Sequence, residues 1–166
     1  MVVHKAQRVG VFVDVQNMYY SAKNLYRAKV NFKEILKQVV ASRALIRAIT
    51  YVVKTEVIEE EKTFFEALRR IGFEVKSKPL QIFYGGAKKG DWDVGIVIDA
   101  IEMAPKLDVV ILVSGDGDFI PLVEHLKRAM SCRVEVVAFS KSASSKLIEA
   151  ADSFLDLCED KKYLIK

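Results

Sequence analysis

Two aspartates follow a strongly apolar run in the second half of the chain. Residues 109–113 read Val-Val-Ile-Leu-Val, and residues 114–118 read Ser-Gly-Asp-Gly-Asp. The run predicts a buried strand, and a helical pattern begins directly after it. Open α/β sheets bind their ligands at the carboxyl ends of strands. Because Mg²⁺ and Mn²⁺ prefer carboxylate oxygens, Asp116 and Asp118 suggest a site for a hard metal ion.

Two further aspartates stand at the ends of predicted elements. Asp14 closes an apolar run, and Asp93 lies in the first turn of a predicted helix, where the helix dipole favours an anion. The first and fourth strands of a doubly wound sheet are commonly neighbours, which would place Asp14 beside Asp116. Clustered carboxylates raise one another's pKa unless a cation lies between them. A divalent ion there lowers the pKa of bound water and stabilises charge on a phosphoryl oxygen.

Each aspartate also has a local interpretation. Asp14 and Asp118 would be helix N-caps, Asp93 a first-turn residue and Asp116 a turn former. Their joint placement at the ends of predicted strands and helices favours a common site. Within the pair after the fourth strand, Asp116 is the stronger candidate for direct ligation, because Asp118 is also placed to cap the next helix.

Alternating strands and helices position these residues. Strands are predicted over residues 8–15, 45–53, 73–77, 107–113, 133–139 and 154–157, and helices over residues 18–27, 32–42, 56–71, 91–103, 119–130 and 143–151. Asn17 and Asn31 are the predicted N-caps of the first two helices. The alternation predicts a three-layer α/β/α fold with a doubly wound, mainly parallel sheet of the Rossmann-like kind. We expect one domain over residues 1–166, with a core of about residues 8–157.

The composition is that of a globular protein, with 51% apolar and 29% charged residues. No apolar run approaches the roughly 20 residues of a membrane-spanning helix. The first eight residues lack the apolar stretch of a signal peptide, so a cytoplasmic protein without membrane association is expected. Cys132 and Cys158 are too few and too scattered for a disulfide framework or a zinc site.

Charge is distributed unevenly along the chain. Residues 21–54 hold eight Lys or Arg and one Glu, and residues 76–90 hold four Lys and no acid. Residues 91–118 reverse the balance, with seven Asp or Glu against Lys106 alone. An acidic centre flanked by basic segments suits a polyanion whose phosphate is handled by a metal ion. Any single lysine is more simply explained as solvating a helix face.

Three segments, in this order, resemble the signatures of the NYN domain, the LabA-like branch of the PIN-like nuclease superfamily. They are residues 13–17 (Val-Asp-Val-Gln-Asn), residues 89–94 (Lys-Gly-Asp-Trp-Asp-Val) together with residues 98–100 (Ile-Asp-Ala), and residues 113–119 (Val-Ser-Gly-Asp-Gly-Asp-Phe). The resemblance spans residues 8–157. It implies a PIN-like fold and a Mg²⁺- or Mn²⁺-dependent endoribonuclease-like domain that acts on RNA. A homodimer is one arrangement that it leaves open.

The resemblance also implies roles for individual residues. Asn17 would be a polar partner of the first-strand carboxylate, and Ser114 would line the pocket through its hydroxyl or its backbone N–H. The acids that hold metal and activate water would be Asp14, Asp93, Asp116 and Asp118.

Three other residues near these motifs have less direct roles. Asp99 matches a family position, but it lies about 240° round the helix from Asp93, so a supporting role is expected for it. Lys88 and Lys89 stand in a Gly-rich loop that either approaches a phosphate backbone or is simply solvated. Tyrosines near the first motif would stack on bases or pack in the core or against a partner.

Three functions follow from these patterns. The first is metal-dependent hydrolysis of a phosphodiester in RNA. The second is a non-catalytic RNA- or protein-binding regulatory module that retains the acidic pocket. The third is a phosphate-transfer domain with Asp14 as nucleophile, which would leave the Asp-Gly-Asp pair without a role.

Overall fold

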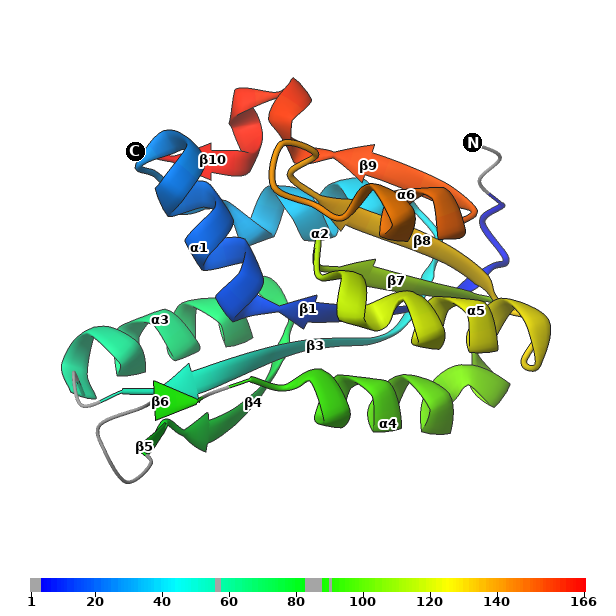
Figure 1. Cartoon of the computed structure of the whole chain (residues 1–166), viewed down its shortest axis with the longest axis horizontal. Helices are drawn as coiled ribbons and strands as arrows, with labels where there is room; N and C mark the ends of the chain where they lie inside the picture. Colours follow the sequence, from blue (N-terminus) through cyan, green and yellow to red (C-terminus); the bar gives the residue numbers. More distant parts are fainter. Residues whose placement is uncertain (1–3, 56–57, 83–87, 90) are drawn as a thin grey trace.

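A six-stranded parallel sheet forms the centre of the computed structural model, which describes residues 4–55, 58–82, 88–89 and 91–166 (Figure 1). From edge to edge the strand order is β4-β3-β1-β7-β8-β9. The strands are β1 (Arg8–Asp14), β3 (Ala44–Lys54), β4 (Glu74–Pro79), β7 (Val109–Val113), β8 (Arg133–Ala138) and β9 (Ser153–Asp156). Because helices cover both faces, the inner strands are buried on both sides, which explains their unbroken apolar runs.

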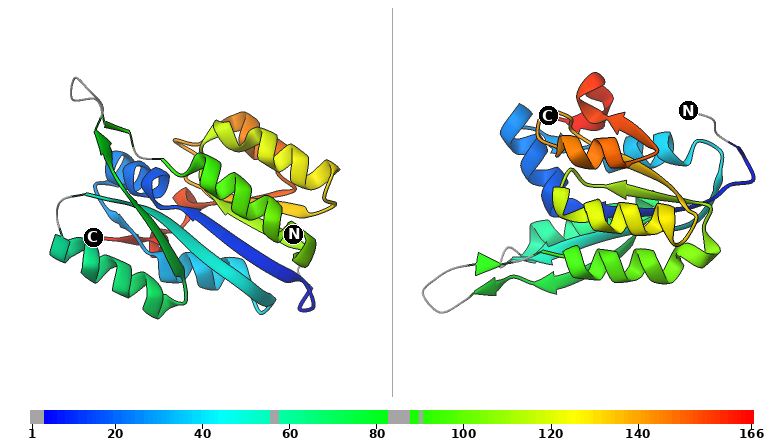
Figure 2. Two further views of the ribbon diagram at one scale, coloured as in Figure 1. Left: turned by 90° about the horizontal axis from the view of Figure 1, so that it is seen from below. Right: turned by 45° about the vertical axis from the view of Figure 1, so that its right-hand side comes forward.

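Helices pack on both faces of the sheet (Figure 2). One face carries α1 (Val15–Tyr26), α2 (Phe32–Val40) and α3 (Ile58–Ile71), and the other carries α4 (Asp93–Met103), α5 (Ile120–Arg128) and α6 (Ser145–Ala150). Alternate residues of β1 divide between the two cores: Val11 and Val13 pack with α1–α3, and Phe12 packs with α4–α6. This arrangement confirms the predicted three-layer, doubly wound α/β/α fold.

Short elements that were not predicted complete the fold. β2 (Lys29–Val30) pairs antiparallel with β10 (Leu164–Ile165), and β5 (Gln81–Ile82) pairs antiparallel with β6 (Lys88–Lys89). Four 3₁₀ turns are described: η1 (Ala104–Lys106), η2 (Gly117–Phe119), η3 (Leu157–Glu159) and η4 (Lys161–Tyr163). Elements of two or three residues are too short to show a hydrophobic period, so the sequence carries no signal for them.

The topological switch point lies between β1 and β7. These strands are neighbours, as predicted, with Val13 opposite Val113. From β1 the chain winds through β3 to one edge, and from β7 it winds through β8 to the other. The carboxyl ends of β1 and β7 therefore open into a shared crevice.

Two further observations bear on the predicted class of protein. Cys132 and Cys158 are both free thiols. Within the part of the chain that the structure describes, the helices are too short or too polar to cross a bilayer.

Candidate metal centre

Asp14 ends β1 and also caps α1. Its Oδ1 accepts the backbone N–H of Asn17 at 3.2 Å, so the carboxylate satisfies one of the free N–H groups at the helix start. The prediction that Asn17 is the N-cap is therefore wrong, and α1 begins at Val15. Only 8% of Asp14 is exposed. Burial raises the pKa of its carboxyl, although the hydrogen bonds from Asn17 and Ser114 oppose the rise.

Ser114 connects the ends of the two central strands. Its fully buried hydroxyl donates to Oδ2 of Asp14 at 3.2 Å and accepts the backbone N–H of Asp116 at 3.2 Å. Asn17 makes a second connection, because its Oδ1 accepts the backbone N–H of Gly115 at 2.9 Å. These bonds hold the first-strand carboxylate against the loop that follows β7.

The two glycines of this loop allow the segment before α6 to approach closely. A Cβ at Gly115 would lie 2.9 Å from Cβ of Ala143, and a Cβ at Gly117 would lie 3.1 Å from Oγ of Ser144. The backbone N–H of Ser144 donates to the carbonyl of Gly115 at 2.9 Å. Larger side chains would displace the loop and with it the carboxylate of Asp116.

Asp93 reaches the crevice from the opposite layer, as the first residue of α4. The helix start is fixed by Trp92, whose indole Nε1–H donates to the carbonyl of Val52 on β3 at 2.8 Å. The Trp92 ring also packs on Tyr51, with 5.4 Å between the ring centroids. The backbone N–H of Asp93 donates to Oδ1 of Asp91 at 3.3 Å. Together these contacts hold the N-terminus of α4 at the switch point.

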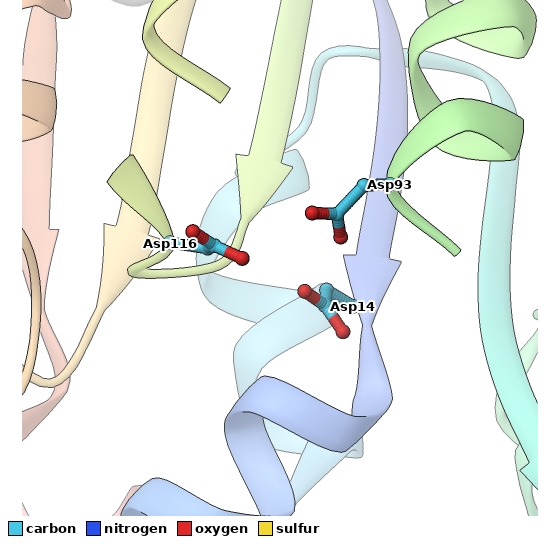
Figure 3. Close-up of side chains that lie close together, drawn as sticks. All are labelled: Asp14, Asp93 and Asp116. Carbon is cyan, nitrogen blue, oxygen red and sulfur yellow. The ribbon is translucent and has the colours of Figure 1, made fainter. Parts of the chain in front are cut away.

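The side chains of Asp14, Asp93 and Asp116 point toward one another (Figure 3). One carboxylate oxygen from each lies within 4.8 Å of the other two. Burial, followed by the charges of Asp116 and Asp14, raises the pKa of Asp93 to about 6. Three carboxylates in such proximity repel one another when ionised, and their oxygens are the donors that Mg²⁺ and Mn²⁺ prefer. The residues present therefore fit a divalent cation.

Asp118 lies at the edge of this group. It lines the same pocket, which has a volume of about 420 Å³, but it is exposed and lies outside the three-carboxylate cluster. Asp118 does not cap α5, whose N-cap residue is Phe119. Instead its backbone N–H donates to Oδ1 of Asp116 at 2.9 Å, so Asp116 caps the turn η2.

The remaining predicted residues lie elsewhere. The Asp99 carboxylate accepts the hydroxyl of Tyr51 at 2.7 Å and forms an ion pair with Lys76 at 2.7 Å, so it ties α4 to β3 and β4. Lys88 and Lys89 form β6, and their side chains lie outside the described residues.

The pocket lining also includes residues that were given no catalytic or metal-binding role in the sequence analysis, among them Asp91, Tyr20 and Ser142. Asp91 stands two residues before Asp93, a spacing that could have indicated it. Tyr20 follows Asn17 by three residues, and helical periodicity places the two on one face. Ser142 comes from the loop between β8 and α6, and a serine in an irregular loop carries no such signal.

Fold and site together define the class of protein: a doubly wound α/β domain with an acidic, metal-compatible pocket at its switch point. The family model of the NYN domain matches residues 8–158, and the chain belongs to this family.

Two relatives extend the comparison. Over 173 residues the chain is 27% identical to the Low amplitude and bright protein LabA of Synechococcus elongatus (strain ATCC 33912 / PCC 7942 / FACHB-805). This match covers 98% of this chain and 90% of LabA. The crystal structure of VPA0982 from Vibrio parahaemolyticus RIMD 2210633, a protein of unknown function, matches with a TM-score of 0.90 and 36% identity. That match covers 99% of this chain and 100% of the Vibrio chain. The predicted NYN and LabA-like assignment is thus confirmed.

Proposed function

We propose that this chain is a divalent-metal-dependent endoribonuclease of the cytoplasm. The convergence of Asp14, Asp93 and Asp116 at the switch point carries this proposal. Mg²⁺ or Mn²⁺ is the proposed cofactor, because both ions prefer oxygen ligands and retain waters that can react. Membership of the NYN family supports RNA as the substrate.

A bound ion would lower the pKa of a water molecule and stabilise charge on the phosphoryl oxygens. The chain's own residues would orient the reactants. Ser114 and Asn17 keep the Asp14 carboxylate and the loop after β7 in place. Asp118, exposed at the rim of the pocket, would accept the proton of the attacking water. Attack on phosphorus breaks the P–O3′ bond and leaves a 5′-phosphate and a 3′-hydroxyl.

Cleavage of a labelled single-stranded RNA in the presence of Mn²⁺ tests the proposal. The wild type should cut the RNA, and Asp14→Asn and Asp116→Asn should each lose at least about 100-fold in rate. Asp108→Asn is the matched control, because Asp108 is exposed, pairs with Arg8 and lies outside the pocket. DNA of the same sequence should be cut more slowly.

Equal cleavage by the wild type and both pocket variants would refute the assignment. A protein that binds Mn²⁺ and RNA without cutting would instead be the non-catalytic RNA-binding module considered above.

A further inference from the structure

A second hollow adjoins the acidic pocket along α1. It has a volume of about 710 Å³ and shares Asn24 with the acidic pocket. The pairing of β2 with β10 brings the last strand beside the end of α1 (Figure 1). Ile165 and Lys166 therefore line the hollow together with residues of α1. We name this hollow the α1 groove, because it runs along that helix. Its polar and aromatic lining residues are Tyr19, Lys23, Asn24, Arg27, Lys29 and Lys166.

The α1 groove is positively charged. Lys23, Arg27, Lys29 and Lys166 line it, and no Asp or Glu is among its described lining residues. Within the described part of the chain none of these four cations forms a salt bridge. Unpaired cations that line one groove attract a polyanion, and each phosphate they neutralise releases counterions.

Two tyrosines stand where the α1 groove meets the acidic pocket. Tyr19 lines the groove and Tyr20 lines the pocket, and these residues are 48% and 50% exposed. Their rings meet edge to face with 5.3 Å between centroids, and Nζ of Lys23 lies 5.7 Å from the Tyr19 centroid. Exposed aromatic rings beside cations provide stacking surfaces for unpaired bases. Duplex nucleic acid offers no free base face, and an acidic peptide has no bases to stack.

We propose that the α1 groove and the tyrosine pair bind the flanking segment of a single-stranded RNA whose scissile phosphate enters the acidic pocket. This inference rests on RNA as the proposed substrate and adds the path and strandedness of that RNA. From Asp14 to Arg27 the helix rises about 20 Å at 1.5 Å per residue. A stacked strand covers this distance with about six nucleotides at 3.4 Å each. A stacked RNA shorter than this does not span both hollows.

Fluorescence anisotropy of a labelled 12-nucleotide RNA, measured with the full chain in EDTA, tests the inference without cleavage. The triple variant Lys23→Gln/Arg27→Gln/Lys29→Gln should lose at least about 10-fold in affinity at 50 mM salt. The slope of log affinity against log salt is negative, and the triple variant should make it less steep by about 2, which is 0.7 for each of three lost phosphate contacts. Tyr19→Ala/Tyr20→Ala should weaken binding between about 5- and 150-fold, whereas Tyr19→Phe/Tyr20→Phe should retain most of it. A 4-nucleotide RNA should bind more weakly than the 12-mer.

The matched control removes three exposed charges outside both hollows, on α2 and α3: Lys33→Gln/Lys37→Gln/Lys62→Gln. Equal losses in the groove and control triple variants would overturn the proposal, because binding would then follow net charge alone. Equal affinity for duplex RNA, or for a polyglutamate of the same charge, would also overturn it. Circular dichroism of each variant checks that it is folded.

The binding readout separates this inference from the nuclease assignment. An inactive protein whose RNA affinity depends on the α1 groove would contradict the nuclease alone. An active protein whose groove and tyrosine variants bind normally would contradict the groove alone.

Discussion

Replacing Asp93 by Asn should stabilise the metal-free protein at pH 7 while it weakens the metal centre. The pKa of Asp93 is raised to about 6 by burial and by the charges of Asp116 and Asp14. An unfolded chain ionises its aspartates near pH 3.9, roughly two units lower. The folded state therefore binds more protons between about pH 4 and pH 6, and the stability of the metal-free protein falls as the pH rises through this window. Asn removes this penalty because it stays neutral.

The size of the effect follows from the shift and from the exposure of the side chain. Two pKa units correspond to about 3 kcal/mol for a group shielded from solvent. Asp93 is only partly buried, so solvent screens the repulsion and the expected gain is about 1 kcal/mol. For a chain of 166 residues this raises Tm by about 2–4 °C.

Thermal denaturation followed by circular dichroism measures both halves of this prediction. In EDTA, the Tm of the wild type minus the Tm of Asp93→Asn should decrease as the pH rises from 4.5 to 7. Addition of Mn²⁺ at pH 7 should raise Tm of the wild type and change that of the variant little. Asp108→Asn is the control, because Arg8 lowers the pKa of Asp108 and its neutralisation brings no gain. A lower Tm for Asp93→Asn in EDTA at pH 7, or equal stabilisation of both proteins by Mn²⁺, would refute the reasoning.

Three further predictions follow from individual contacts. Ser114→Ala should lower Tm in EDTA and reduce Mn²⁺ affinity, measured by calorimetry, by about 10-fold, because the buried Asp14 carboxylate loses a donor; unchanged affinity would contradict this. Mn²⁺, a paramagnetic ion, should quench the fluorescence of Trp92, the single tryptophan, more strongly than Mg²⁺; equal responses would argue against binding beside α4. In the wild type the buried Arg43 guanidinium lies 2.8 Å from the Glu135 carboxylate. Glu135→Ala leaves this guanidinium buried without its carboxylate, so the free energy of unfolding in urea should fall by about 3–5 kcal/mol. A loss below about 1 kcal/mol would be inconsistent with that burial.

The convergence of Asp14 with Asp116 was predictable because two strong regularities act together. Unbroken apolar runs mark strands that are buried on both faces, and parallel doubly wound sheets commonly place the first and fourth strands side by side. The register of β1 on β7 then brings the two strand ends level. Asp93 was harder to place, because it follows a connection without hydrophobic periodicity. Its position depends on Trp92 packing against β3, which is a tertiary contact.

The start of α1 shows where local rules are insufficient. Asp and Asn are comparable N-cap residues, so Asp14 and Asn17 were both admissible from their types. The choice depends on where β1 ends, and its pairing with β7 continues to Val13. With Asp14 as the cap, Asn17 falls inside the helix, and its amide oxygen is free to accept the N–H of Gly115. A shift of three residues in the helix start thus changes Asn17 from a cap into a link between α1 and the loop after β7.

The basic segment of residues 21–54 shows why charge counts alone do not define a binding surface. Its members Lys23, Arg27 and Lys29 line the α1 groove and form no salt bridge with any residue that the structure describes. Arg43 is buried in a pair with Glu135, and Arg47 pairs with Glu74 at 2.7 Å. A paired charge acts at a distance as a dipole, whose field falls off faster than that of an unpaired cation. The field that a phosphate backbone experiences therefore comes mainly from the cations that the fold leaves unpaired. Three of these stand at or just beyond the end of the helix that begins at the candidate metal centre: Lys23 in the last turn of α1, Arg27 at its C-cap and Lys29 on β2.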